Sequence, residues 1–348
     1  MPEGIKVGKP RLSPLASYIL TRALLIIPTI LILYTLVFIV LRVIPGNPIE
    51  AALGTRYIPE ELKQQLAERL GLNKPLYVQY FEYLWNILHG DFGESLVIRG
   101  RPIWEDLKAR FPATLELTIW GFTISVFLGL LTGTLAAVKR GSKIDTSMRI
   151  FSIVAYTLFI PWLGMMLQLV FGLWLGWLPT SGRLSARIEL DTITGIYTLD
   201  AILTGNIPAF IDAVKHLILP SLTLGIVLSG AYTRLVRTNL SEVLASDFIR
   251  AYKARGIRDT KVLRHALKNA FIPIVTMMGL QFAILLGGAV LTETTFSWPG
   301  MGSYLLEKVT YRDYTAIQGA VIFFAFFVGL ISLIVDVIYA LIDPRIRY

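Results

Sequence analysis

Long apolar runs, separated by charged stretches, divide the chain. A helix needs about 20 apolar residues to cross the hydrocarbon core of a bilayer. Six runs come close to this length or exceed it, at residues 23–41, 117–138, 150–174, 216–233, 270–291 and 314–337. The third run has a Trp-rich end, which we expect at the membrane interface, where Trp is enriched. The pattern predicts an all-α polytopic membrane protein with six transmembrane helices.

The charges between the runs predict the orientation. Residues 139–149 and 234–269 are rich in Lys and Arg, whereas 181–212 carries more acidic than basic side chains. Cytoplasmic loops have an excess of Lys and Arg, so both basic loops are expected in the cytoplasm. The N-terminal segment 1–22 and the tail 343–348 are expected on the same side. The first run lacks a small-residue cleavage site, so we expect an uncleaved span.

A small extracytoplasmic insert, residues 42–111, is predicted after the first span. Leucines recur at helical spacing over residues 62–70, and an aromatic-rich run over 77–90 predicts a second helix that stops at Gly90. The insert would seal an outer vestibule, anchor the first span, contact a partner or merely pack. Its boundary with a core of five spans, residues 112–342, is placed at Phe111–Pro112.

Composition agrees with a membrane protein. The chain is 54% hydrophobic and 16% charged, whereas soluble domains carry about 25% charged residues. The net charge of +9 would suit nucleic acid only on a soluble basic surface, so we expect contact with membrane lipid and no nucleic acid. There is no cysteine, which excludes disulfides and thiol chemistry. His89, His216 and His265 show no metal-ligand spacing and are interpreted as ordinary surface or interface histidines.

The chain lacks the motifs of several activities. It has no GxxxxGK[ST] phosphate loop, no GxSxG and no HExxH, so no ATP site or catalytic site of its own is expected. A secondary transporter would show inverted repeats and coupling-ion residues near the midplane, and neither is recognisable. The glycines of "GLLTGT" and "LLGG" lie inside apolar runs, where small residues more often allow close helix packing.

Three acidic residues lie in or beside the apolar runs. Glu116 and Glu293 stand at the outer ends of the second and fifth spans, where we expect them to be solvated. Asp336 lies deeper, and an ionisable group in a span usually faces a partner or a cavity. Pairing with an arginine or a helix N-terminus is favoured over a place on the transport pathway. Residues 292–305 are expected to form an outer re-entrant or interfacial turn.

The basic loop 234–269 carries a helix–glycine–helix pattern. Asp247 is expected to cap a first short helix, and Gly256 to break it. A second helix, capped by Asp259 or Thr260, then leads into the fifth span. Lipid binding does not require such regularity, so the pattern favours a docking element for a cytoplasmic protein. One face of the first helix mixes apolar and basic side chains, namely Phe248, Ala251, Tyr252 and Arg255.

The segment "DFIRAYKARGIRDTKVLRHALKNAFIPI" resembles the cytoplasmic loop of ABC importer permeases. That loop reads Glu-Ala-Ala, three residues, Gly, nine residues, Ile-x-Leu-Pro. Gly256 and Ala251 match, but Arg250 replaces the glutamate, Tyr252 the second alanine, and residues 266–269 the final motif. "RHALKNAFIP" and "ARG" are more similar to the dipeptide/oligopeptide/nickel branch, B-type subunit. "LRVIPGNP", "GDFGES", "PATLEL", "GGAVLTETTFSWPGMGSYL" and "LIDPRIRY" extend this resemblance across most of the chain.

The resemblance implies a type I ABC importer permease fold in the cell membrane. It implies three kinds of partner: a second homologous permease, two cytoplasmic ATPase subunits and an extracytoplasmic solute-binding protein. ATP and Mg²⁺ would be bound by the partner ATPase, leaving this subunit without a cofactor. Peptides are the leading solute, with oligosaccharides and nickel chelates left open. The residues implied in ATPase coupling are Phe248, Arg250, Ala251, Tyr252, Ala254, Arg255, Gly256 and Arg264.

Overall fold

The computed structural model of the protein describes residues 14–43, 60–69, 71, 73–97 and 100–342. These residues are helical apart from turns, irregular connections and an isolated bridge between Glu94 and Pro102. The predicted tail 343–348 and the first part of segment 1–22 lie outside the described residues.

The helices follow one another from α1 to α14, with one π-helix, η1. Their bounds are α1 Pro14–Val43, α3 Glu60–Arg69, α4 Leu76–Leu88, α5 Ile103–Val138, α6 Lys143–Thr157, α7 Ile160–Leu167, η1 Gln168–Trp174, α8 Tyr197–Leu203, α9 Ile207–Leu244, α10 Asp247–Ala254, α11 Asp259–Gly288, α12 Val290–Thr295, α13 Met301–Thr310 and α14 Tyr314–Ile342.

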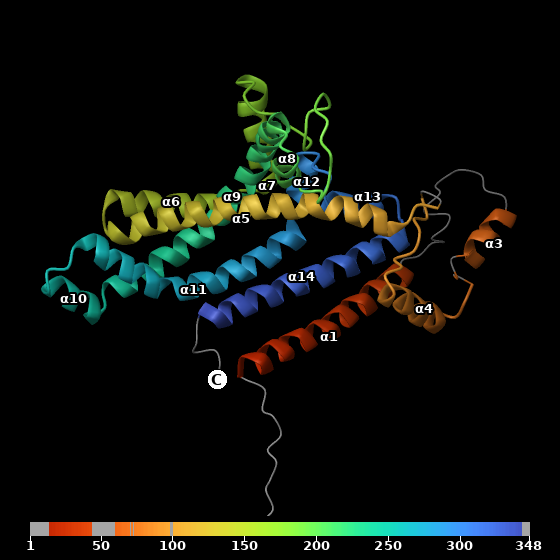
Figure 1. The fold of residues 1–348 in the computed structure, drawn as a ribbon, viewed down its shortest axis with the longest axis horizontal. Helices are drawn as coiled ribbons and strands as arrows, with labels where there is room; N and C mark the ends of the chain where they lie inside the picture. The colour runs from red at the N-terminus through yellow and green to blue at the C-terminus, as the bar shows by residue number, and fades with distance from the viewer. Residues whose placement is uncertain (1–13, 44–59, 70, 72, 98–99, 343–348) are drawn as a thin grey trace, which may run out of the picture.

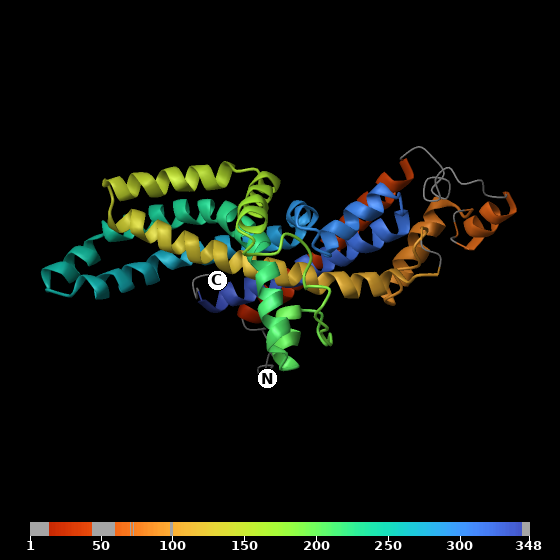
Figure 2. The same ribbon diagram turned by 90° about the horizontal axis from the view of Figure 1, so that it is seen from above.

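The long helices lie side by side, and the short helices α7, α8 and α12 gather near the middle of the molecule, beside α5 (Figure 1). α5, α6 and α9 pack together, while α11 and α14 join them to α1. α10 stands at one end of the molecule, and α3 and α4 stand at the opposite end in both views (Figure 2). The arrangement therefore separates the predicted docking loop from the predicted insert by the length of the bundle.

Glycines allow α5 and α9 to pack closely. A Cβ atom at Gly121 would lie 3.0 Å from Leu224 Cβ, and one at Gly133 would lie 2.6 Å from Val236 Cβ. Contacts thus advance by equal steps along both helices, so α5 and α9 run in the same direction. This confirms the packing role predicted for the "GLLTGT" glycines, and the direction is the one predicted for the second and fourth spans.

Within the part of the chain that the structure describes, four helices are long and apolar enough to cross a membrane, and two bent helix pairs raise the number of candidate spans to six. The predicted all-α polytopic architecture is confirmed. α5 differs from its prediction because it begins at Ile103 and passes through Phe111 and Pro112 without a break. Its 36 residues extend about 54 Å, well beyond a hydrocarbon core of about 30 Å, so the helix joins the insert directly to the span.

The third predicted span is not one straight helix. α6 ends at Thr157, and α7 with η1 continues at an angle of 104° to it. Leu158 and Phe159 have extended backbone, and Pro161 stands in the first turn of α7. Proline lacks the amide hydrogen needed to continue the preceding helix. The chain therefore turns away from α6, and the span predicted over 150–174 is bent.

The predicted helices of the insert are present as α3 and α4. Gly90 adopts a φ of +82° just beyond α4, a left-handed conformation that favours glycine, so the predicted stop at this residue is confirmed. α4 packs against the first span: the Tyr34 hydroxyl donates to Tyr80 O at 2.6 Å, and the Tyr80 ring lies edge-on to Phe38. Of the roles left open for the insert, these contacts support anchoring of the first span.

Candidate functional site

The predicted docking element is a compact knob formed by the end of α9, by α10 and by the start of α11. α10 begins at Asp247, so the cap position belongs to Ser246, whose side chain forms no capping bond. Asp247 instead pairs with Arg250, with Nη1 and Oδ1 3.4 Å apart. α11 begins at Asp259 and its cap position is Arg258. The predicted caps were each misplaced by one residue or more, while the two helices are as expected.

Gly256 ends α10 with a well-defined terminus. Its φ is +70°, and its amide donates to Lys253 O at 3.0 Å while the Ile257 amide donates to Tyr252 O at 3.2 Å. These two bonds form a Schellman motif, in which an apolar residue beyond the glycine commonly contacts the helix. Ile257 and Tyr252 belong to the same apolar cluster. The prediction that Gly256 breaks the helix is confirmed.

The inner side of the knob is fixed to the ends of the long helices. Ile249 of α10 is fully buried in a cluster that contains Ala137 of α5, Leu240 of α9 and Val262 of α11. The Tyr252 ring lies edge-on to Phe248 and to His265, with ring centroids 5.9 and 5.4 Å apart. A load on α10 would therefore reach three long helices through packed side chains. The cluster also explains the tyrosine at a position where the related loops carry a small residue.

The outer side of the knob is solvent-exposed and basic. Lys253, Arg258 and Lys261 add to the charge of the predicted residues, and Phe248, 39% exposed, places an aromatic ring among them. Of the residues predicted for ATPase coupling, Tyr252 is partly buried, and the exposed ones are Phe248, Arg250, Ala251, Ala254, Arg255, Gly256 and Arg264. The structure brings all of them together on the knob, on α10, the turn that follows it and the start of α11.

A partly buried ion pair connects the helices beside the knob. Arg237 of α9 donates to both carboxylate oxygens of Asp145, from Nε at 2.6 Å and from Nη2 at 2.9 Å. The same carboxylate accepts the Gly141 amide at 3.0 Å. A planar guanidinium bound in this bidentate way fixes geometry as well as charge. The basic turn between α5 and α6 is thus held to α9.

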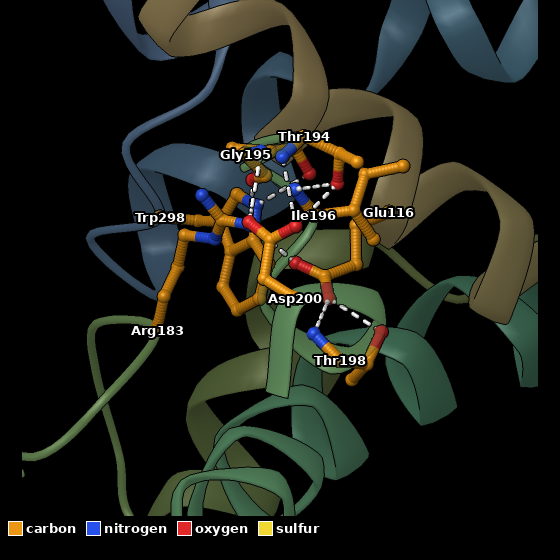
Figure 3. A network of polar contacts seen from close by, with 9 residues as sticks. Glu116, Arg183, Thr194, Gly195, Ile196, Thr198, Asp200 and Trp298 are labelled. Atoms are coloured by element: carbon orange, nitrogen blue, oxygen red, sulfur yellow. Dashed lines mark hydrogen bonds and ion pairs between the residues drawn. The ribbon is translucent and has the colours of Figure 1, made fainter. Parts of the chain in front are cut away.

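At the opposite side of the membrane helices, a buried polar network joins α5 to the long connection before α9 (Figure 3). Glu116 accepts from Arg183 and from both the amide and hydroxyl of Thr198, the latter two at 2.8 and 2.7 Å. Arg183 also donates to Gly195 O at 2.8 Å. Glu116 is only 2% exposed, so its expected solvation is wrong: the connection folds over it and supplies the donors that water would provide.

Asp200 anchors the same connection. It accepts the Thr194 amide and hydroxyl on one oxygen and the Gly195 amide on the other, at 2.7 to 2.9 Å. Burial by itself raises the pKa of this carboxyl, but the bonds from Thr194 and Gly195 outweigh it and hold the pKa below its usual value. Its negative charge therefore stabilises the turn that carries Thr198 towards Glu116.

Glu293 forms a second buried contact, between α12, α13 and α5. Its oxygens accept the Thr114 hydroxyl at 2.6 Å and the Ser303 amide at 2.8 Å. Trp298, in the turn between α12 and α13, donates to Ala113 O at 2.9 Å. The expected solvation of Glu293 is also wrong, because the side chain is fully buried, and desolvation raises its pKa. The segment 292–305 is folded inward as a helix–turn–helix.

The remaining predictions about ionisable groups can be placed. Asp336 lies against Arg22 with Oδ2 and Nε 3.4 Å apart, which confirms the favoured pairing with an arginine. His216 is buried and contacts Asp212 of the same helix, whereas His89 and His265 are exposed. No group of three potential metal ligands occurs among the described residues, and the absence of a cofactor stays a prediction.

Comparison with known proteins decides the family. The profile of the binding-protein-dependent transport system inner membrane component matches residues 129–348, and that of the N-terminal region of such membrane components matches residues 15–118. The chain belongs to this family of transport-system membrane components. The predicted membrane location and type I importer permease fold are thereby confirmed.

The permeases to which the chain is similar match it almost end to end. It is 41% identical to the di/tripeptide transport system permease protein DppB of Pseudomonas aeruginosa over 333 residues, 95% of this chain and 99% of that protein. It is 41% identical to the dipeptide transport system permease protein DppB of Escherichia coli K12 over 335 residues, 95% and 98% of the two chains. The glutathione transport system permease protein GsiC of Salmonella choleraesuis is 40% identical over 336 residues, 95% and 99%.

Proposed function

We propose that the chain is the permease subunit of an ATP-driven, binding-protein-dependent importer of di- and oligopeptides. It would form half of the translocation pathway, with a second homologous permease forming the other half. Two cytoplasmic ATPase subunits would bind ATP and Mg²⁺, and an extracytoplasmic solute-binding protein would deliver the peptide. In this arrangement both termini lie in the cytoplasm. Family membership and the names of the similar permeases support the proposal.

The observation that carries the mechanism is the packing of the knob. Its exposed basic side is suited to a groove on another protein, while its buried side is continuous with α5, α9 and α11. Closure of the ATPase pair would push α10, and the shared apolar cluster would transmit that movement to the spans as a rigid body. ATP supplies the free energy, and this subunit supplies the coupling and the path.

Substitution of Gly256 tests the coupling role of the knob directly, because the position requires glycine for its backbone conformation and not for space. No atom lies within 4 Å of a Cβ added there, but its φ of +70° disfavours a side chain. Left-handed backbone costs about 1–2 kcal/mol in a non-glycine residue, or about tenfold in an equilibrium. In proteoliposomes that contain the full transporter, Gly256→Val should reduce peptide uptake about tenfold while ATP hydrolysis continues.

Gly205 provides the matched control. Its φ is +68°, and a Cβ there also meets no atom within 4 Å, but it lies between α8 and α9, away from the knob. Gly205→Val should leave the ratio of uptake to ATP hydrolysis unchanged, and Gly256→Asn should retain more uptake than Gly256→Val because asparagine tolerates this conformation. Normal uptake by Gly256→Val would refute the assignment of the knob.

The solute is tested in the same vesicles. The three similar permeases named above are designated for dipeptides, di/tripeptides or glutathione, which favours short peptides over the oligosaccharides and nickel chelates that the resemblance left open. With the cognate binding protein, wild-type vesicles should accumulate a labelled dipeptide and neither a labelled oligosaccharide nor chelated nickel. Accumulation of one of the latter alone would replace the solute but leave the coupling mechanism standing.

A further inference from the structure

One side of α4 carries a row of large apolar side chains that no described residue covers. Tyr77, Phe81, Trp85 and Leu88 are between 64% and 71% exposed. Their spacing of four, four and three residues places them on one helical face. An exposed apolar surface of this kind marks contact with a protein or a membrane. We call these four residues the α4 stripe.

The neighbouring side of α4 is fixed to the membrane helices. The Thr35 and Tyr80 hydroxyls are 2.8 Å apart, and the Tyr83 hydroxyl donates to Thr315 O, at the start of α14, at 3.4 Å. The residues of α4 that pack around Tyr34, Phe38 and Ile322 are Tyr80, Tyr83, Leu84 and Ile87. The helix is therefore held at a defined level along α1.

That level lies within the apolar part of the first span. The candidate span Ile19–Val43 has 25 residues, and it is about 38 Å long. A hydrocarbon core of about 30 Å, centred on it, would end about 4 Å before Val43. Tyr34 and Phe38, which contact Tyr80, lie about 8 to 13 Å before Val43. α4 thus meets α1 below the outer limit of the hydrocarbon.

The third side of α4 is polar. Glu82 accepts from Lys74 Nζ at 2.7 Å, and Asn86 is exposed beside it. The helix consequently has one side on protein, one apolar side uncovered and one polar side. Helices that lie in the plane of a membrane surface have an apolar side in the acyl boundary and a polar side in water. Tyr and Trp, which contribute half of the stripe, are enriched at that depth.

We infer that α4 is an interfacial membrane helix and that the α4 stripe contacts phospholipid. Lipid is the molecule that covers the α4 stripe, because α4 is attached to α1 at the depth of the hydrocarbon. The polar side of α4 is already satisfied by Lys74 or by solvent. The contact would fix the depth of the first span in the bilayer. Only the choice of leaflet, the one opposite the knob, rests on the function proposed above.

Adjacent residues on the two uncovered sides allow a direct test. The chain has no cysteine, so Phe81→Cys and Glu82→Cys each introduce a single site for a nitroxide spin label. The complete transporter is reconstituted into phosphatidylcholine–phosphatidylglycerol vesicles. Accessibility is then measured to oxygen, which concentrates in the bilayer, and to chromium oxalate, which stays in water.

The label at Phe81 should be accessible to oxygen. Its accessibility to chromium oxalate should be at least about fivefold lower than that of the label at Glu82, which corresponds to a difference of ~1 kcal/mol in the free energy of the reagent at the two sites. If the Phe81→Cys variant assembles poorly, Trp85→Cys takes its place, and its label should give the same result. Equal exposure of both sites to chromium oxalate would show that the stripe faces water. Protection of Phe81 and Trp85 from both reagents would show that a protein covers it. Either result overturns the inference, whether or not the vesicles transport peptide.

Discussion

The carboxylate of Glu293 packs so closely against Gly300 that no side chain fits at position 300. A Cβ atom at Gly300 would overlap the carboxylate of Glu293, which itself holds Thr114 and Ser303. We therefore expect Gly300→Ala and Glu293→Ala each to destabilise the protein. The second substitution leaves buried donors unpaired, at about 1–3 kcal/mol each. In the double variant the overlap is absent, so the two effects should not add.

The measurement is a double-mutant cycle on the thermal stability of the detergent-solubilised protein. Coupled sites deviate from additivity by about 0.5–3 kcal/mol, and we expect the double variant to be more stable than the sum predicts. Gly319→Ala is the control, since its Cβ would meet Ile103, at 3.2 Å, and not the carboxylate. Its effect should add to that of Glu293→Ala. Additivity of the Gly300 pair would contradict the described packing.

The same residues show where the sequence is informative at this scale. Asp336 lies within the apolar helix α14, six residues before its end at Ile342, so the need for a partner could be predicted, and Arg22 provides it. Glu116 and Glu293 lie near the ends of their runs, where water is the simplest partner. Their burial depends on segments distant in the chain, such as the turn that brings Arg183 to Glu116. Apolar periodicity carries no information about such a contact.

At the scale of elements, Tyr252 holds α10 in its position against α11. The ring packs on His265 and the cluster beneath the helix, while its hydroxyl makes no hydrogen bond among the described residues. Removing a partly buried ring should weaken the packing of α10 against α11 by about 1–2 kcal/mol. We expect Tyr252→Ala to lower the retention of purified ATPase subunits on permease-containing vesicles about fivefold, and Tyr252→Phe to leave it unchanged. Equal retention by both variants would show that the ring does not position α10.

Element existence follows from the sequence more reliably than element shape. Gly256 and Gly90 end α10 and α4 as predicted, because a left-handed terminus is a local requirement that glycine meets. The bend between α6 and α7 was not predicted from a long apolar run, although Pro161 is a visible local signal. α11 likewise bends by 53° between Asp259–Phe271 and Pro273–Leu286. Hydropathy measures length and polarity, whereas these bends depend on individual backbone donors.

At the scale of the whole molecule, the helix directions fit a single topology. α5 and α9 run in the same direction, and α1 and α14 run in opposite directions, since Arg22 meets Asp336 while Arg42 meets Gln318. A chain that crosses the membrane six times from the cytoplasm has these relative directions. The knob and α4 then lie on opposite sides, which the positive-inside rule assigns to cytoplasm and exterior.

Single cysteines can test this assignment because the chain has none of its own. Ser303 is a poor site, since it is partly buried and its hydroxyl donates to Trp298 O at 2.9 Å. Ala186 and Ala254 are exposed, in the connection before α8 and in α10. A membrane-impermeant maleimide should label Ala186→Cys in intact cells with an opened outer envelope, and label Ala254→Cys only after the membrane is permeabilised. The cysteine-free parent is the control. The reverse pattern would place the knob outside, where no ATPase could reach it, and would overturn both the topology and the coupling mechanism.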